Sequence, residues 1–199
     1  MASQNIVPPN LPVAPVQYEA RYQDQFLNVL RLFFTTLTNK INGPVPHGSF
    51  YDTTTQTNPV ANAVNLMQFN SVYDSADGTQ YAVKKDTNRV YITQTGVYNI
   101  AFSAQLDHVG GGNTTIYIWI RVNGQSVSNS ATKVVIAGPN DEKVAAWNWI
   151  LTLKAGDYFE LAWESPSTGT ILLAEAATGN IPEIPSVILT VAWVSNVAI

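Results

Sequence analysis

From Pro46 to the C-terminus, side chains alternate between apolar and polar, and this period of two limits the fold more than any other feature. Successive side chains of a β-strand point to opposite faces of the sheet, so the alternation predicts strands with one buried face. The clearest case is residues 98–106, with Tyr98, Ile100, Phe102, Ala104 and Leu106 on the apolar side. Similar runs occupy residues 114–122, 143–154, 157–163 and 187–194.

Turn sequences rich in glycine, proline and asparagine separate these runs, at residues 110–113, 123–124, 138–140, 155–157 and 165–166. Many strands divided by turns, with no helical periods between them, favour an antiparallel sandwich or barrel. We therefore predict an all-β domain over residues 44–199. A long loop is expected over residues 165–185.

Two of the predicted strands are apolar on both faces. In residues 116–122 the isoleucines fill one face, while Tyr117 and Trp119 lie on the other. In residues 143–154 one face carries Trp147, Trp149, Leu151 and Leu153, and the other carries Val144, Ala146 and Ile150. A strand that is apolar on both faces needs a cover on each, and a symmetry-related copy is one way to supply it.

The first 43 residues follow a different pattern. Residues 1–16 contain four prolines among small apolar residues, which favours an extended arm. In residues 17–43 apolar side chains recur every three or four positions, the period of one helix face. The stripe consists of Tyr22, Phe26, Val29, Leu30, Phe33, Phe34, Leu37 and Ile41, and Asn42-Gly43-Pro44 is expected to end the helix. Such a stripe must pack on the sandwich, on sister helices or on another protein.

The composition argues against several classes of function. Charged residues make up 12% of the 199 residues, about half the usual share. The net charge of −4 gives no basic surface for nucleic acid. The sequence contains no run of about 18 apolar residues of the kind that spans a membrane. The absence of cysteine excludes disulfides, thiolate metal sites and cysteine nucleophiles. No signal-peptide pattern is present at the N-terminus.

The sequence offers only weak candidates for chemistry. Asp107-His108 could belong to a metal or acid–base site, but a metal site needs three or more converging ligands. Residues 74–78 hold two aspartates but lack the closing glutamate of a helix-loop-helix calcium site. Nothing brings two of the scattered glutamates together as a glycosidase pair. Tyr158 and Trp163 could stack on sugars, although regular alternation favours burial. We therefore expect no enzyme, no metal and no cofactor.

Four segments together resemble the jelly-roll family of complement globular heads and tumour-necrosis-factor cytokines, in the form found in structural proteins of tailed phages. They read SFYDTTTQT at residues 49–57, GVYNIAFS at 96–103, IWIRVNG at 118–124 and AGDYFEL at 155–161. The resemblance covers roughly residues 48–195. It implies an antiparallel jelly-roll sandwich that forms a homotrimer, with Tyr98, Phe102, Tyr117 and Trp119 as candidates for either the core or the threefold interface.

The N-terminal segment resembles that of fibre and virion proteins of marine phages, through LPVAP at residues 11–15 and the aromatic and apolar residues that follow. This second resemblance implies attachment to other virion proteins. The candidate attachment residues are Leu11, Pro12, Pro15, Tyr18, Tyr22, Phe26, Leu30, Phe33, Phe34 and Leu37.

Two functions follow from these resemblances. The first is a structural protein of the virion, docked by its arm and helix and projecting a trimeric jelly roll as a short fibre, knob or decoration. The second is a module that binds a host glycan or protein receptor through distal loops, for which Gly111, Asn113, Ser165 and Thr168 are the candidate residues.

Overall fold

The computed structural model describes residues 8–13, 16–17, 19–41, 46–73, 79–80, 83–138 and 141–196. It divides the chain into two compact units, residues 2–45 and residues 46–199. In the first unit, residues 8–13 form neither helix nor strand, and α1 spans Ala20–Ile41. The helix predicted from the apolar stripe is therefore confirmed. Its expected stop at residues 42–44 lies outside the described residues.

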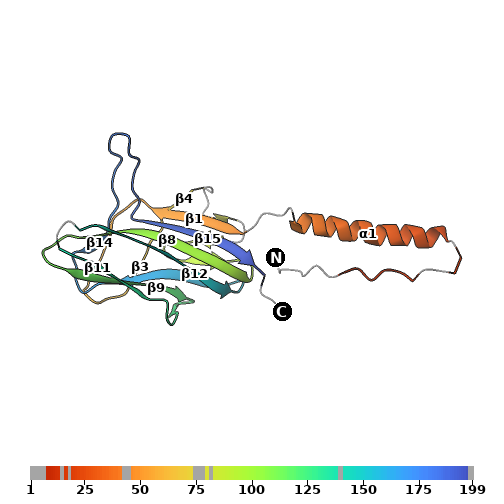
Figure 1. The fold of residues 1–199 in the computed structure, drawn as a ribbon, viewed down its shortest axis with the longest axis horizontal. Helices are drawn as coiled ribbons and strands as arrows, with labels where there is room; N and C mark the ends of the chain where they lie inside the picture. Colours follow the sequence, from red (N-terminus) through yellow and green to blue (C-terminus); the bar gives the residue numbers. More distant parts are fainter. Residues whose placement is uncertain are drawn as a thin grey trace. The chain divides into compact units, whose positions relative to one another are not determined.

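The second unit contains two β-sheets that pack as a sandwich (Figure 1). Sheet A contains β1 (His47–Asp52), β2 (Gln56–Thr57), β4 (Ser71–Val72), β8 (Gly96–His108), β12 (Lys143–Leu153), β14 (Thr170–Leu172) and β15 (Val187–Ser195). Sheet B contains β3 (Asn65–Leu66), β5 (Thr79–Gln80), β6 (Val83–Lys85), β7 (Val90–Ile92), β9 (Thr114–Val122), β10 (Gln125–Ser126), β11 (Thr132–Ile136) and β13 (Tyr158–Glu164). The predicted all-β class is confirmed.

All described strand pairings are antiparallel, and four of them are nested along the chain. The first long strand, β1, pairs with the last, β15. Moving inward from both ends, β7 pairs with β13, β8 with β12, and β9 with β11. The order across sheet A is β4-β1-β15-β8-β12, and the order across sheet B is β5-β6-β7-β13-β9-β11. Members of each sheet thus come from distant parts of the sequence.

The core lies between the two sheets, where the predicted alternation places it. Every second residue of β8 is buried, from Gly96 to His108. In β9 the isoleucines at 116, 118 and 120 are fully buried. The largest fully buried side chains are Trp163, Tyr98, Phe50, Phe69 and Phe159. Alternation therefore marked the inward-facing residues of the long strands correctly.

The long loop predicted at residues 165–185 is wrong in part. Its first section contains β14, which pairs with both β8 and β2. Its second section is a narrow ribbon held by antiparallel bridges between Glu175 and Ile184 and between Thr178 and Ile181. This ribbon projects from the sandwich (Figure 1). The pairing of β14 was not predicted because β2 and β8 lie far away in the sequence. The ribbon was not predicted because its bridges are single and form no regular strand.

Candidate assembly surface

The outer face of sheet A is the most unusual surface of the sandwich, because it carries no Asp, Glu, Lys or Arg where β1, β15, β8 and β12 lie side by side. The outward residues of β8 there are Val97, Asn99, Ala101, Ser103 and Gln105, and those of β12 are Val144, Ala146, Asn148, Ile150 and Thr152. The next outward residue of β8, Asp107, pairs with β14 and lies beyond this part. The face is completed by Ile188, Thr190 and Ala192 of β15 and by His47, Ser49 and Tyr51 of β1. We call this set the neutral face.

Small side chains make the middle of the neutral face flat. Ala101 of β8 lies between Thr190 of β15 and Asn148 of β12, and Thr190 is paired on its other side with Ser49 of β1. The Asn148 amide donates a 2.8 Å hydrogen bond to Asn99 Oδ1, so each of these polar side chains has one partner within the face itself. At the margin Val144 and Ile150 are 61% and 63% exposed. Depletion of charge is the compositional mark of an interface core.

Strand β12 forms one edge of sheet A and pairs only with β8 among the described strands. Its eleven residues include a single charge, Lys143, at the first position. Lys143 lies 2.7 Å from Asp141 and lowers the pKa of that carboxyl group by hydrogen bonding. Sheet edges in soluble monomers are usually protected by charges, proline or bulges. A long neutral edge beside a neutral face is therefore a surface that needs a cover.

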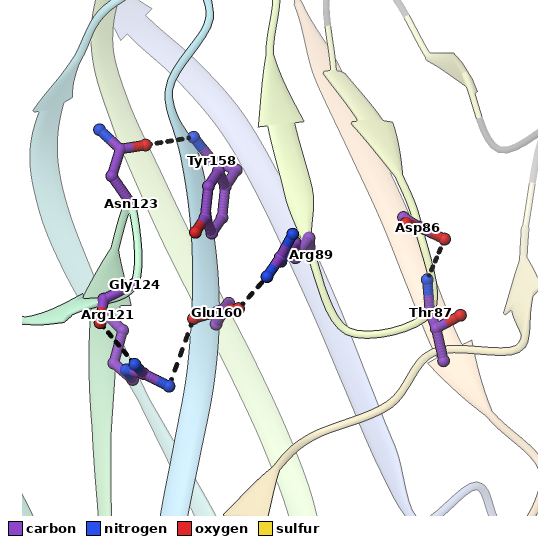
Figure 2. Close-up of polar contacts among 8 residues, drawn as sticks. All are labelled: Asp86, Thr87, Arg89, Arg121, Asn123, Gly124, Tyr158 and Glu160. Atoms are coloured by element: carbon purple, nitrogen blue, oxygen red, sulfur yellow. Dashed lines mark hydrogen bonds and ion pairs between the residues drawn. The ribbon is translucent and has the colours of Figure 1, made fainter.

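The outer face of sheet B has the opposite character (Figure 2). The carboxylate of Glu160 is 2% exposed and lies between Arg89 Nε at 3.1 Å and Arg121 Nη1 at 3.5 Å. The guanidinium of Arg89 also lies 4.6 Å from the ring centre of Tyr158. Hydrogen bonds with Tyr91 and Glu160 raise the pKa of Arg89. Charged and aromatic groups thus cover this face, whereas the neutral face has only uncharged ones.

The residues proposed for a threefold interface do not form one surface. Tyr98 and Phe102 are buried between the sheets, so the structure assigns them to the core. Tyr117 and Trp119 point outward from β9, on the charged outer face of sheet B, and Trp119 Nε1 donates to Ser126 Oγ at 3.0 Å. The set included residues of two faces for a simple reason. Alternation shows which residues of a strand share a face, but not whether that face points to the core or to solvent. The lack of charge at alternate positions of residues 97–105 and 144–152 was the signal that sequence reasoning missed.

The distal-loop residues also divide. Gly111, Asn113 and Thr168 are exposed, and they remain accessible for binding. Ser165 is fully buried, and its hydroxyl lies 2.6 Å from Thr170 Oγ1 and 3.3 Å from Thr114 Oγ1. Ser165 therefore supports the loop from inside, and its proposed role as a contact residue is wrong.

Among the candidate attachment residues, the helix stripe is partly accessible along its length. Tyr22, Phe26, Leu30, Phe33 and Leu37 are half-buried, and Phe34 and Leu11 are exposed. Within this unit the Tyr22 hydroxyl donates a 3.4 Å hydrogen bond to the carbonyl of Pro12, and the Tyr22 ring stacks on Phe26. Pro15 and Tyr18 lie outside the described residues.

The remaining candidates for chemistry are separated by the fold. His108 is buried, and its Nε2 lies 2.9 Å from Ser167 Oγ, while Asp107 accepts the His108 backbone N–H. In the described part of the chain, no three His, Cys, Asp or Glu residues come together as a metal site would require. The aspartates at 74–78 lie outside that part. Trp163 is buried, as its alternation indicated, and Tyr158 is half-buried beside Arg89.

Comparison of the sequence with protein-family models gives no match, and comparison with curated proteins gives none either. In the described residues, α1 lacks the apolar length needed to cross a bilayer.

Proposed function

We propose that this chain is an oligomeric structural protein of a tailed-phage virion. In this proposal the sandwich forms a homotrimer through the neutral face, and the N-terminal arm and α1 attach it to other virion proteins. The trimer projects as a short fibre, knob or decoration and performs no catalysis. The observation that carries the proposal is the neutral face with an edge strand that is charged only at Lys143, in a chain that carries buried and exposed charges on its other sheet.

The nested strand pairing supports a jelly roll as the finer description of the sandwich. A jelly roll arises when one long antiparallel hairpin is wound around a barrel-like core, so its first and last strands pair, then the second and the seventh, and so on inward. The pairs β1·β15, β7·β13, β8·β12 and β9·β11 follow this rule. The resemblance of the sequence to jelly-roll structural proteins of phages agrees with it.

The neutral face supports self-association for a physical reason. Burying an unpaired charge is costly, so a surface without charges can be removed from water with little desolvation penalty. Val144 and Ile150 then contribute apolar area, and the Asn99–Asn148 pair already makes one hydrogen bond within the subunit. In a closed ring, one patch of each chain contacts a different patch of the next chain. The neutral face and the β12 edge are two such patches. The number three comes from the family resemblance.

The spacing of the helix stripe supports the attachment role. Phe26, Leu30, Phe33 and Leu37 follow steps of four, three and four residues, which keeps them on one seam of the helix. Such a seam suits either a groove of another virion protein or the helices of sister subunits. The proposal therefore places this protein in the virion, after assembly in the host cytoplasm.

Solution mass tests the assembly. We expect light scattering of the full chain to give three times 21.7 kDa. Thr190→Arg puts a charge in the middle of the neutral face and should give a folded monomer. Val135→Arg is the matched control, because Val135 is also exposed on a strand but faces outward from sheet B. A monomeric wild type, or equal effects of the two variants, would refute the proposed interface.

The virion location needs a separate experiment. Quantitative mass spectrometry of purified phage particles should detect the protein at a copy number that is a multiple of three. Its absence from particles would rule out the structural role, whatever its oligomeric state in solution.

One observation favours receptor binding as a second function. The ribbon of residues 175–184 projects from the sandwich (Figure 1), and Gly111, Asn113 and Thr168 are exposed in other loops. Projecting loops on a rigid scaffold are common sites of recognition. If they bind a host receptor, antibodies against this ribbon should block adsorption of the phage. Unchanged adsorption at saturating antibody would count against the idea.

A further inference from the structure

Helix α1 carries a second apolar seam, which shares Leu30 and Leu37 with the seam described above. Its members follow alternating steps of three and four residues, and they are Ala20, Gln23, Leu27, Leu30, Phe34, Leu37 and Ile41. This register runs from the first residue of α1 to the last, and Gln23 is its only polar member. Such steps keep one line of a helix facing a partner helix, as in a coiled coil. We call this set the heptad seam.

The arm covers one margin of the apolar face of α1 and leaves the other margin open. The Tyr22 hydroxyl donates to the Pro12 carbonyl at 3.4 Å, and the Tyr22 ring stacks on Phe26 with 6.2 Å between ring centres. Because a helix turns by ~100° per residue, Tyr22 and Phe26 lie toward one margin, and Leu27 and Phe34 lie toward the other. Leu27 and Phe34 are 54% and 57% exposed. In the described part of this unit, the heptad seam therefore still needs a cover.

The connectivity of the chain makes sister helices the nearest partners for this seam in a trimer. Only four residues, 42–45, lie between the last residue of α1, Ile41, and the first residue of the sandwich unit, Pro46. Short tethers of this kind hold linked groups at an effective concentration of the order of ~1 mM. Rotation about a threefold axis also gives the three helices the same direction along that axis. They therefore meet in parallel, with equal residues at one level.

The charges on α1 permit this arrangement. In a parallel bundle, the residues that flank the seam face each other across it. In the heptad register Phe26 faces Arg31 of the next helix, and Phe33 faces Thr38 of the next helix. An arginine beside an aromatic ring is a favourable neighbour. The heptad seam is itself uncharged, and within Ala20–Ile41 no like charges are brought together across it. Charge repulsion does not oppose self-association here.

We propose that the heptad seams of sister subunits pack together in a parallel bundle, so that α1 is a second oligomerisation element beside the neutral face. This inference rests on the proposed function for the number three and for the parallel direction. The margin with Tyr22 and Phe26 stays outside the bundle, where the arm lies and where other virion proteins can bind. The two margins of one helix thus divide self-association from attachment.

Cysteine crosslinking of the full chain tests the bundle, because the chain has no cysteine of its own. Leu27→Cys places one thiol on the heptad seam, where equal residues of sister helices meet. Leu32→Cys is the matched control, because Leu32 is 58% exposed and lies about 140° away around the helix. After mild oxidation, Leu27→Cys should give a disulfide-linked dimer on a non-reducing gel. It should contain up to about two thirds of the chains, since one thiol per chain joins only two of three. Leu32→Cys should give no such band.

Dissociation of the oligomer on dilution gives a second readout. Phe34→Asp would place three carboxylates at one level of the heptad seam, and burying such charges is costly. We expect this variant to raise the concentration at which the trimer dissociates by about tenfold or more. Leu32→Asp introduces the same residue on the opposite side of the helix and should leave that concentration unchanged.

Light scattering of the same proteins separates this inference from the proposed function. A trimer in which Leu27→Cys links no more than Leu32→Cys would overturn the bundle and leave the trimer of the sandwich intact. Equal dissociation of Phe34→Asp and Leu32→Asp would overturn it in the same way, and the seam would then belong to a different protein. A monomeric wild type would instead refute the proposed function, and the bundle would be refuted with it.

Discussion

At the scale of single residues, Tyr98 links the stability of the sandwich to pH. Its hydroxyl donates a 2.6 Å hydrogen bond to the carbonyl of Gln94, and burial raises its pKa to about 12. The unfolded chain releases the same proton near pH ~10. The folded state therefore holds the proton more tightly, and this contribution to stability is complete below pH ~10 and lost as pH rises through about 12.

We expect Tyr98→Phe to remove this part of the pH dependence. The free energy of unfolding, measured with urea at a series of alkaline pH values, should fall less steeply in the variant than in the wild type. Tyr117→Phe is the control, because Tyr117 is exposed and its substitution should leave the curve parallel to wild type. Parallel curves for Tyr98→Phe would contradict the assignment.

Gly96 shows how closely one side chain can approach a strand. A Cβ atom at this position would lie 2.2 Å from Trp193 Nε1 and 3.0 Å from the Ser195 carbonyl oxygen. Gly96→Ala must displace the indole or the backbone, and should lower the free energy of unfolding by about 1–3 kcal/mol. Gly111→Ala meets no atom within 4 Å and should change it by less than about 0.5 kcal/mol. Urea unfolding of both variants measures the two changes in the free energy of unfolding. Equal losses in the two variants would contradict this prediction.

At the scale of elements, the long strands could be predicted from the sequence because their pattern is local. The run at 114–122 coincides with β9, and that at 143–154 exceeds β12 by one residue. The short strands between residues 56 and 92 could not be predicted, because two or three residues do not establish a period of two. Pairing was equally hidden, because β8 meets β12 and β15, whose residues lie far along the chain.

The candidate site was less predictable than the strands for the same reason. The neutral face becomes visible only when four strands from both ends of the domain are placed side by side. The sequence identified the aromatic residues of the strands, but it did not show which of them face the core.

Helix α1 allows a prediction at this scale about what its stripe contacts. If the stripe binds other virion proteins or sister helices, Phe33→Glu should abolish incorporation into particles while leaving the thermal unfolding of the sandwich unchanged. Arg31→Glu, on a different side of the helix, is the matched control and should incorporate normally. A lower melting temperature for Phe33→Glu alone would show instead that the stripe packs on the sandwich.

At the scale of the whole molecule, the two units are expected to divide the work of assembly. Residues 46–199 have their own core, and every described strand of both sheets belongs to this unit. A domain with its own core can fold alone. Removal of residues 1–45 should therefore leave a folded protein whose melting temperature matches that of the sandwich in the full chain.

The same truncated protein distinguishes the surfaces that hold the oligomer. If the neutral face and the β12 edge associate, the truncated protein should still have three times its own monomer mass in light scattering, and Thr190→Arg in this background should give the monomer. It should also fail to enter particles, because the arm and α1 are gone. If the truncated protein is monomeric although folded, the helices drive assembly, and the neutral face must be covered by a different virion protein.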